Sequence, residues 1–463
     1  MGEIKYRAEE EMRNSGIEWL EKVPHEWGVT KLKYMMLVNP VKSEIKNKNQ
    51  ECSFVPMNKI HNGTIEIDDV KRISEVYDGY TYFKNGDIVM AKVTPCFENG
   101  DIAIASDLVN NIAFGTTEIN VFRVKYGYDI RFVYYRLQES HFMKYGSVHM
   151  TGVAGLKRLP TSYITDFKTL IPRMREQQKT SNFLDVKTAQ FNTIISKKKQ
   201  LIKKLEEAKK SLISEVVTGK VKIVDGVMVK RQPEEMKYSR VEWLGMIPRD
   251  WEIKKVKYFT TKVGSGKTPK GGAESYVDDG IIFLRSQNVH NNGIELGDIV
   301  KIDKRTDREM SNSRVIDQDL LLNITGASIG RSSIFINMDF SANVNQHVCI
   351  IRLRKEIENK EFYLYLLQSH FLQDQIMSLQ TGTSREGLNF EQIKNLLFTH
   401  PKSDDERGIA LEYLRAQLND FNNIILKNKI QIQKLKQAKR SLISEAVTGK
   451  IDLRDWEIVE EGE

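Results

Sequence analysis

The stretch Ala208-Lys-Lys-Ser-Leu-Ile-Ser-Glu-Val-Val-Thr-Gly-Lys220 returns near the end of the chain as Ala438-Lys-Arg-Ser-Leu-Ile-Ser-Glu-Ala-Val-Thr-Gly-Lys450. Eleven of the thirteen positions are identical, at an offset of 230 residues. A second echo pairs Ile17-Glu-Trp-Leu20 with Val241-Glu-Trp-Leu244, at an offset of 224. Both offsets far exceed the period of solenoid repeats, so the chain contains two related halves.

Apolar residues at seven-residue spacing precede each copy of the duplicated stretch. In the first half they are Leu184, Phe191, Leu205 and Leu212, and in the second half Leu414, Phe421, Leu435 and Leu442. We place Ile194, Leu201 and Ala208, with Ile424 and Ala438, at the intervening position of the same seam. Sustained heptads are typical of coiled coils, and glycine at 219 and 449 suits a left-handed helix cap. The sequence therefore predicts two long helices that pair with each other in an antiparallel coiled coil.

A stretch of about 170 residues precedes each predicted helix, with short apolar runs separated by turn signals. Asn62-Gly63, Asn85-Gly86 and Asn292-Gly293 are typical of tight turns between strands. We expect an α+β fold with two similar strand-rich domains, each followed by a long helix. The expected boundaries are 1–175 for the first domain, 176–228 for the first helix and linker, 229–403 for the second domain, and 404–463 for the second helix and acidic tail.

The composition excludes several classes of protein. Hydrophobic residues make up 40% and charged residues 29%, and no run approaches 18 apolar residues, so a membrane protein is not expected. The three cysteines are far apart in the sequence, and the N-terminus lacks a secretory signal, so we expect a cytoplasmic protein. The net charge of +8 is compatible with a polyanionic partner, and its excess lies in segments 176–220 and 405–450.

No convincing catalytic or metal-binding set stands out in the sequence. Gly264-Ser-Gly-Lys-Thr268 resembles the end of a phosphate-binding loop, but Thr261 stands where the first glycine belongs, and Pro269 follows. The eight histidines lack metal-ligand spacing, and no glycine-rich cofactor loop accompanies a methylase motif. A nucleotide hydrolase that uses Lys267 is therefore the weaker alternative, and we expect a non-catalytic chain that binds no cofactor.

Loops rich in basic, amide and hydroxyl side chains suggest recognition instead. Such side chains hold phosphates and read base edges in DNA. The candidate DNA-binding residues are Lys92, Thr94, Asn99, Lys157 and Arg158 in the first half, and Lys267, Arg285, Gln287, Asn288, Ser328, Arg331, Ser384 and Arg385 in the second half. A structural coiled-coil scaffold without DNA contacts remains the other alternative.

Several duplicated or distinctive motifs together resemble one known family. They are the openings with Trp19-Leu20, Pro24 and Trp27, the segments Gly266-Lys-Thr-Pro269 and Asn345-Gln-His-Val348, and the two Lys-Ser-Leu-Ile-Ser-Glu helix ends. Over essentially its whole length, the chain resembles the DNA-specificity subunit of type I restriction–modification systems. The resemblance implies two target-recognition domains, each reading one half of a split site in double-stranded DNA, on an antiparallel coiled coil.

The resemblance also implies partners. Two copies of a methyltransferase subunit would bind this frame, and a translocating nuclease subunit can join them. S-adenosylmethionine, and ATP with Mg²⁺ where a nuclease subunit is present, are then expected on those partner subunits. The first half departs from the pattern, because Phe114-Gly-Thr-Thr-Glu118 stands where the second half has Asn345-Gln346. Since the two domains differ, we expect two different half-sites and a non-palindromic DNA site.

Overall fold

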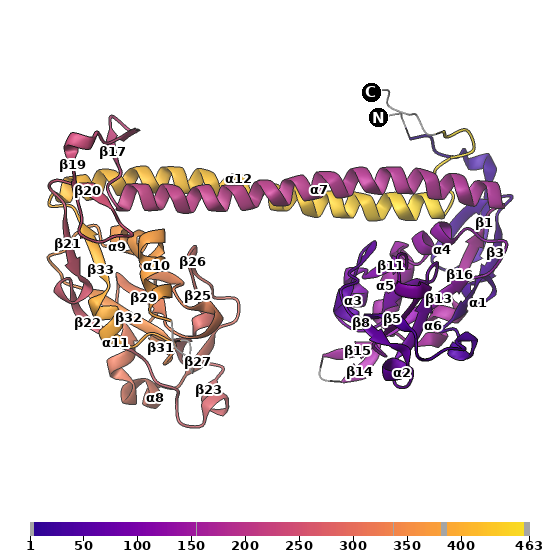
Figure 1. Ribbon diagram of the computed structural model, residues 1–463, viewed down its shortest axis with the longest axis horizontal. Helices are drawn as coiled ribbons and strands as arrows, with labels where there is room; N and C mark the ends of the chain where they lie inside the picture. The colour runs from indigo at the N-terminus through magenta and orange to yellow at the C-terminus, as the bar shows by residue number, and fades with distance from the viewer. Residues whose placement is uncertain (1–3, 154, 337, 381–386, 458–463) are drawn as a thin grey trace. The chain divides into compact units, whose positions relative to one another are not determined.

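The computed structural model describes residues 4–153, 155–336, 338–380 and 387–457. The chain divides into two units, the first comprising Met1–Lys198 with Lys429–Glu463 and the second Lys199–Asn428. This division assigns part of each long helix to each unit. Each unit is therefore a strand-rich globule with its own share of both helices (Figure 1). Within the described ranges, no helix is long and apolar enough to cross a membrane.

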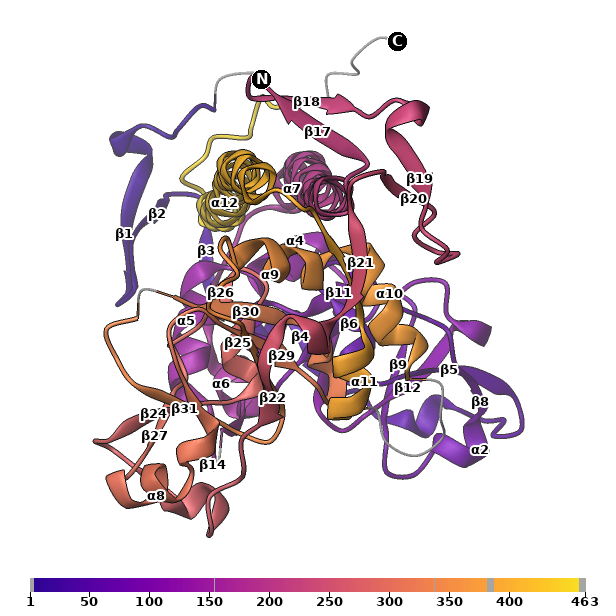
Figure 2. The ribbon, with the colours of Figure 1, turned by 90° about the vertical axis from the view of Figure 1, so that its left-hand side faces the viewer.

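The two long helices are α7 (Met174–Val217) and α12 (Asp404–Val447), each of 44 residues. In the first unit, Leu184 near the start of α7 shares a buried cluster with Leu442 near the end of α12. In the second unit, Leu212 near the end of α7 shares a cluster with Leu414 near the start of α12. The helices therefore pair antiparallel, as the heptads predict, and Figure 2 looks along them.

One set of seam residues was predicted wrongly. The seven-residue series from Leu184 and Leu414 lies in the seam, buried or half-buried. The intervening position, however, is one residue later than expected. Ile194 is 38% exposed whereas Ile195 is 8% exposed, and Ile424 is 44% exposed whereas Ile425 is 8% exposed. Leu201, Ala208 and Ala438 are exposed as well. The reason is that seam positions alternate steps of three and four, and the step after each seam phenylalanine is four.

Each globule contains two larger sheets, the first antiparallel and the second mixed. The first unit has one sheet of β11 (Ile102–Ile104), β10 (Ile88–Ala91), β13 (Ile119–Val124) and β4 (Met36–Val38), and another of β8 (Val70–Arg72), β5 (Glu51–Val55), β12 (Ile112–Gly115) and β9 (Thr81–Lys84). The second unit has one sheet of β22 (Thr260–Ser265), β32 (Val348–Leu353), β29 (Asp319–Asn323) and β30 (Ser332–Phe335), and another of β23 (Tyr276–Val277), β27 (Val300–Ile302), β24 (Ile281–Leu284), β31 (Ala342–Val344) and β28 (Arg314–Val315).

The sheets of the two units correspond in topology. β10 pairs antiparallel with β13 as β29 does with β32, and β5 pairs parallel with β12 as β24 does with β31. A buried ion pair recurs at the same place. Arg123 bonds Asp87 at 2.7 Å, and Arg352 bonds Asp319 at 2.7 Å, with both aspartate side chains 1% exposed. The duplication in the sequence is thus a duplication of the fold.

Short helices cover the first sheet of each unit. They are α4 (Ile130–Arg136), α5 (Ser140–His149) and α6 (Thr161–Asp166) in the first unit, and α9 (Glu361–Gln368), α10 (His370–Ser378) and α11 (Phe390–Asn395) in the second. The first N–H of α5, at Ser140, donates to Ser444 Oγ at 2.9 Å. The first N–H of α10, at His370, donates to Ser214 Oγ at 2.8 Å. The second serine of each Ser-Leu-Ile-Ser stretch therefore attaches its globule to a long helix.

The two duplicated motifs of the sequence meet in space. A side chain at Gly449 would come within 2.5 Å of Pro24 and 3.1 Å of Trp27, and one at Gly219 would come equally close to Pro248 and Trp251. Both glycines also have positive φ, +75° and +72°. Glycine is therefore required at each helix end twice over, by the backbone turn and by the tryptophan packed against it.

A buried ion pair fastens the chain segment that crosses the start of each long helix. Arg7 pairs with Glu176, which also accepts a 2.9 Å hydrogen bond from Trp27 Nε1. The second unit repeats this arrangement with Arg231, Glu406 and Trp251, whose Nε1 donates at 3.1 Å. Several further strands form two-stranded sheets. They pair as follows: β1 (Met12–Ile17) with β2 (Leu20–Pro24), β3 (Gly28–Lys31) with β16 (Lys168–Ile171), β17 (Val221–Val224) with β18 (Val227–Lys230), β19 (Met236–Tyr238) with β20 (Met246–Pro248), and β21 (Glu252–Lys255) with β33 (Leu397–His400).

Candidate nucleic-acid interface

Four of the five candidates in the first half converge on one surface. The segment after β10 lies beside the hairpin of β14 (Thr151–Val153) and β15 (Leu156–Arg158). Thr94 N–H donates to Lys157 O at 3.1 Å, and Lys157 N–H donates to Thr94 Oγ1 at 3.1 Å. Leu159 N–H reaches Lys92 O at 2.8 Å. We call residues 92–94, the described part of this hairpin and Glu118 the first recognition surface. In Figure 1 its hairpin lies on the side of the globule away from the long helices.

The charged side chains of this surface differ in availability. Arg158 donates two hydrogen bonds to Glu118, at 2.9 and 2.7 Å. These bonds lower the pKa of Glu118 and raise the pKa of Arg158. Lys157 is exposed. Asn99, at the exposed end of α3 (Cys96–Asn99), follows the same segment. The guanidinium of Arg158 is thus occupied by a carboxylate, whereas Lys157 presents its charge to solvent.

The second unit builds a surface at the same place in its fold. Ile324 N–H donates to His347 O at 3.0 Å, as Lys92 N–H does to Glu118 O at 3.0 Å. Leu388 N–H donates to Ile324 O at 2.8 Å, which matches the contact of Leu159 with Lys92. We call residues 266–268, 324–331 and 345–347 the second recognition surface.

Side chains connect the parts of the second recognition surface. Thr325 Oγ1 lies 2.6 Å from His347 Nδ1, and Gln346 Nε2 lies 3.2 Å from His347 Nε2. Thr268 hydrogen-bonds to Gln346 Oε1, which brings the exposed Lys267 to this surface. An imidazole therefore occupies the position that a carboxylate holds in the first unit.

The candidates Ser328 and Arg331 lie on a tight turn of the same surface. Arg331 N–H donates to Ser328 O at 3.1 Å, and Asn323 N–H donates to Arg331 O at 2.8 Å. The turn begins with the 3₁₀ helix η10 (Gly326–Ser328). Arg331 is exposed, and its guanidinium forms no hydrogen bond with the described part of the chain. The candidates Ser384 and Arg385 lie outside the described residues.

The remaining three candidates hold a loop of the second domain together. Asn288 is 1% exposed, and its amide donates to Glu295 O and Asp298 O, both at 3.1 Å. Its Oδ1 accepts from Arg285 N–H at 2.9 Å. Arg285 also donates to Asp298 O at 2.8 Å, and Gln287 bonds the Asp298 carboxylate. Asn288 is therefore buried, and its amide nitrogen and oxygen are both engaged within this loop.

Two residues of these surfaces, Glu118 and His347, were missed among the sequence candidates. Both lie in segments that the family resemblance had singled out, Phe114–Glu118 and Asn345–Val348. Their equivalence, however, depends on matching backbone hydrogen bonds across two strands, which no local pattern reveals. The signal that was available is the position of both segments just before a buried strand, β13 or β32.

The phosphate-loop interpretation of Lys267 is not supported by the local fold. Gly266 N–H donates to Asn345 O at 3.1 Å, and a side chain at 266 would collide with the Val344 backbone. The next helical element after Lys267 is the four-residue 3₁₀ helix η7 (Gly272–Ser275). A phosphate-binding loop requires an α-helix that begins at its lysine and threonine. Gly266 is therefore required for a close backbone contact.

Among the described residues, no group of three His, Cys, Asp or Glu side chains could hold a metal ion.

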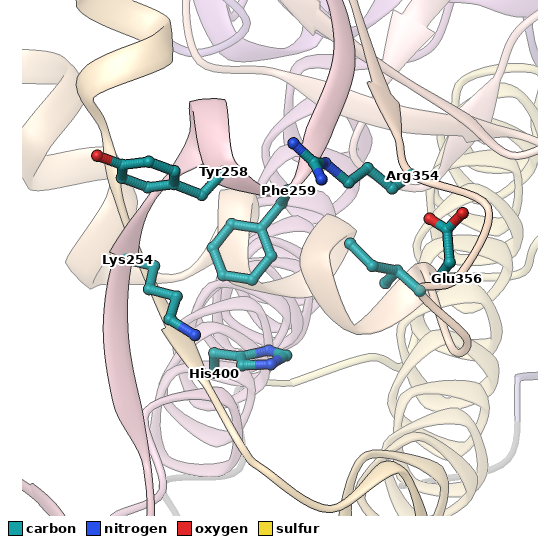
Figure 3. A pocket seen from close by; sticks show the side chains of 7 residues that line it. Lys254, Tyr258, Phe259, Arg354, Glu356 and His400 are labelled. Carbon is teal, nitrogen blue, oxygen red and sulfur yellow. The ribbon is translucent and has the colours of Figure 1, made fainter.

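A cavity of about 600 Å³ lies elsewhere on the second domain. Figure 3 shows its lining residues, with Phe259 between Lys254 and Arg354 and with His400 below it. Arg354 follows the last residue of β32, whereas His347 precedes the first. The cavity and the second recognition surface thus lie at opposite ends of this strand, and the cavity forms no part of the surface.

Comparisons with known proteins point to one family. The family described as "Type I restriction modification DNA specificity domain" matches residues 248–434. The chain is 38% identical over 164 residues to the type I restriction enzyme EcoAI specificity subunit of Escherichia coli. That match covers 34% of this chain and 27% of the relative, so the matched stretch spans about a quarter of the relative's length.

A longer but weaker match covers more of the chain. It is 22% identical over 306 residues to the type I restriction enzyme EcoBI specificity subunit of Escherichia coli, covering 65% of this chain and 62% of that protein. The fold is also similar to a chain in a solved structure of a type I restriction–modification system, with a TM-score of 0.66 at 13% identity. That similarity covers 93% of this chain and 99% of the other. Residues 248–434 are thus similar to the specificity domain of type I restriction–modification systems, and the fold of the chain is similar to that of a chain from such a system. These similarities confirm the resemblance and the fold that the duplicated motifs predict.

Proposed function

We propose that this chain reads a bipartite, non-palindromic site in double-stranded DNA, one half with each recognition surface, and brings partner methyltransferase subunits to it. The observation that carries the proposal is a constant frame with two different readers. Trp27 and Trp251 pack on equivalent helix ends, yet Glu118 and Arg158 occupy one surface where His347 and Thr325 occupy the other. Different side chains at equivalent places would select different bases.

Roles for individual residues follow from exposure and charge. We assign Lys92, Lys157 and Lys267 to phosphate contacts, because lysine acts as a point charge without directional base reading. Thr94, Asn99 and Ser328 are candidates for contacts to base edges, and Arg331 is the candidate for a bidentate contact to guanine. Phosphate contacts weaken as the salt concentration rises, so the affinity of the complex for any DNA should decrease strongly with salt.

The partners are inferred from the duplication and the family. Because the helix ends recur, the frame offers two equivalent places to two copies of one methyltransferase subunit. The chain itself is proposed to be non-catalytic and to bind no cofactor, with S-adenosylmethionine on the methyltransferase, and ATP and Mg²⁺ on any nuclease–translocase subunit. The assembly would act in the cytoplasm, in keeping with three cysteines that are all free.

Mapping methylated bases in DNA tests the proposal directly. The chain is co-expressed with its methyltransferase subunit, and host DNA is sequenced for modified adenines, with the methyltransferase alone as the control. We expect one motif of two unlike half-sites separated by a fixed unspecific gap, present only with both proteins. Methylation that did not need the chain, or that fell at a continuous palindrome, would contradict the proposal. Equal affinity of the complex for its motif and for random DNA would favour the scaffold alternative.

A further inference from the structure

A lysine occupies the same position in the apolar seam of each long helix. Lys209 lies between Leu205 and Leu212 in the seam of α7, and Lys439 lies between Leu435 and Leu442 in that of α12. Both lysines are half-buried, and burial lowers the pKa of each ammonium group. A charged residue at such a position costs stability relative to an apolar one and is often kept because it specifies an arrangement. Its recurrence at an offset of 230 residues indicates that both halves use it.

In the first unit Lys439 connects three elements. Its Nζ donates to Asn192 Oδ1 of α7 at 2.9 Å and to Asn62 Oδ1 at 3.3 Å. Asn62 lies in the turn between β6 (Ile60–His61) and β7 (Thr64–Ile65) of the globule. One ammonium group, itself on α12, therefore binds the facing helix and the recognition domain at the same time.

The second unit repeats this arrangement with the same residue types. Lys209 Nζ donates to Asn422 Oδ1 of α12 at 2.9 Å and to Asn292 Oδ1 at 2.8 Å. Asn292 lies in the turn between β25 (Val289–His290) and β26 (Gly293–Ile294). In both units the two acceptors are asparagine amide oxygens, so directional hydrogen bonds fix the position of the ammonium group.

Each turn also hydrogen-bonds to a residue that is adjacent in sequence to a candidate DNA-binding residue. Asn62 Nδ2 donates to Gly100 O at 2.9 Å, directly after Asn99 and the segment that carries Thr94. In the second unit, Asn291 Oδ1 accepts a 2.9 Å hydrogen bond from the N–H of Ser332, the residue after Arg331. Lys439 is thus two hydrogen bonds and one peptide step from Asn99, and Lys209 is two hydrogen bonds and two peptide steps from Arg331. We propose that both Asn99 and Arg331 face DNA.

We infer that Lys439 and Lys209 are positioning residues, each of which fixes the orientation of its recognition domain on the helix pair and thereby restricts the gap allowed between the half-sites. The inference rests on the proposed function. An extra base pair moves a half-site by about 3.4 Å and turns it by about 34°. A domain held in one orientation tolerates one gap, whereas a domain released from its turn contact can follow such a displacement.

The variant Lys439→Met tests the inference, because methionine keeps the length and the helix propensity of lysine and suits an apolar seam. In the complex with the methyltransferase, methylation rates are measured on sites whose gap is native, or one base pair shorter or longer. We expect the bases read to stay the same and the preference for the native gap to fall by about tenfold, the factor for one lost charge-assisted hydrogen bond. The matched control Lys436→Met, at an exposed position one turn away, should keep the wild-type preference.

Hydrogen exchange gives a second readout that needs no DNA. In Lys439→Met, the amides of residues 60–65 should exchange faster than in wild type, while those of α12 around 439 should be unchanged or slower. Asn62→Ala should have the same effects, and the double variant should add nothing to either single variant, because both remove one contact. An unchanged gap preference with unchanged exchange at 60–65, or equal effects of Lys436→Met, would overturn the inference. A wild-type complex without any site-specific methylation would instead overturn the proposed function, and the exchange experiment would still decide the role of Lys439.

Discussion

At the scale of single residues, the two recognition surfaces differ in whether the guanidinium group of their arginine is already hydrogen-bonded. Arg158 is engaged by Glu118, whereas Arg331 extends from a turn in which both its own N–H and its own C=O are hydrogen-bonded. A fixed turn limits the entropy lost when its side chain binds. Arg331 is therefore the strongest candidate for base recognition in the second domain.

Replacing Arg331 by Ala should weaken binding to the motif by about 1–3 kcal/mol, the discrimination of one bidentate arginine–guanine contact. Binding to random DNA should change far less. Titrations of the complex on motif and random duplexes at one salt concentration measure both. Arg249→Ala is the matched control, because Arg249 is exposed beside the Pro248 contact with the helix end. Equal losses on both duplexes would make Arg331 a phosphate contact instead.

We expect His400 to make the stability of the second domain sensitive to acid. Burial, together with the positive charges of Arg407 and Lys254, lowers the pKa of His400 from 6.5 to about 4. Its Nδ1 lies 2.7 Å from the Tyr363 hydroxyl. Because the unfolded chain binds this proton more readily, the free energy of unfolding falls as pH drops from 6.5 to 4.

The variant His400→Gln should lose part of that pH dependence, because glutamine does not titrate. Urea midpoints measured at several values between pH 4 and 7 should converge with those of wild type at the acidic end, or exceed them. A wild-type slope retained in His400→Gln would show that other groups cause the acid sensitivity.

The roles of individual residues were harder to predict from the sequence than the fold. The segments around Lys92 and Lys157 could be chosen by composition, and the structure brings them together. Asn288 had the same polar character, yet its amide is consumed within its own loop. Whether a polar side chain is free depends on partners distant in sequence, such as Glu118 for Arg158, and a local pattern cannot identify them.

At the scale of elements, the long helices were predictable in existence, pairing and direction, because their heptads are long and end at a Thr-Gly pair. The intervening seam position was predicted one residue too early, because Ile194 and Ile195 are both apolar and the heptad pattern alone did not distinguish them. The order of the strands was not predictable, because parallel neighbours such as β5 and β12 are joined through long intervening segments.

The ion pair that crosses the start of α7 should matter for stability. Its side chains are only 6% exposed at Arg7 and 14% at Glu176. Replacing Glu176 by Ala strands a buried guanidinium and removes the acceptor of Trp27, so unfolding should become easier by about 3 kcal/mol. Urea unfolding measures this change. The control Glu9→Ala removes an exposed partner of Lys22 and should change stability little. Equal effects of the two variants would show that burial of the first pair is unimportant.

The length of the helices is expected to limit the gap between half-sites, because α7 and α12 each continue from one unit into the other. Inserting one heptad after Lys198 and another after Asn428 keeps the seam in register and adds roughly 10 Å to each helix. That equals about three base pairs, which also turn the half-site by about 100°. Methylation should weaken, and what remains should favour wider gaps with both half-sites unchanged.

A heptad in only one helix is the control, because it shifts one seam against the other and should destabilise the pair. Methylation at the original gap and at full strength in the double insertion would show that the helices do not set the distance.

At the scale of the whole molecule, the duplication preserves what holds each domain to the helices and changes what each domain presents. The packing of tryptophan on the helix-end glycine, the buried arginine–glutamate pair and the seam lysine all recur. The side chains of the two recognition surfaces do not recur. The central claim is therefore that the two domains read DNA independently on a common frame.

Exchanging one domain tests that claim most directly. Residues 1–175 are replaced by the corresponding domain of a relative whose methylated motif is known, and the hybrid is expressed with the methyltransferase subunit. Sequencing of modified bases should then show one half-site changed to that of the relative, with the other half-site and the gap unchanged. A change in both half-sites, or methylation that still falls at the original motif, would contradict the account.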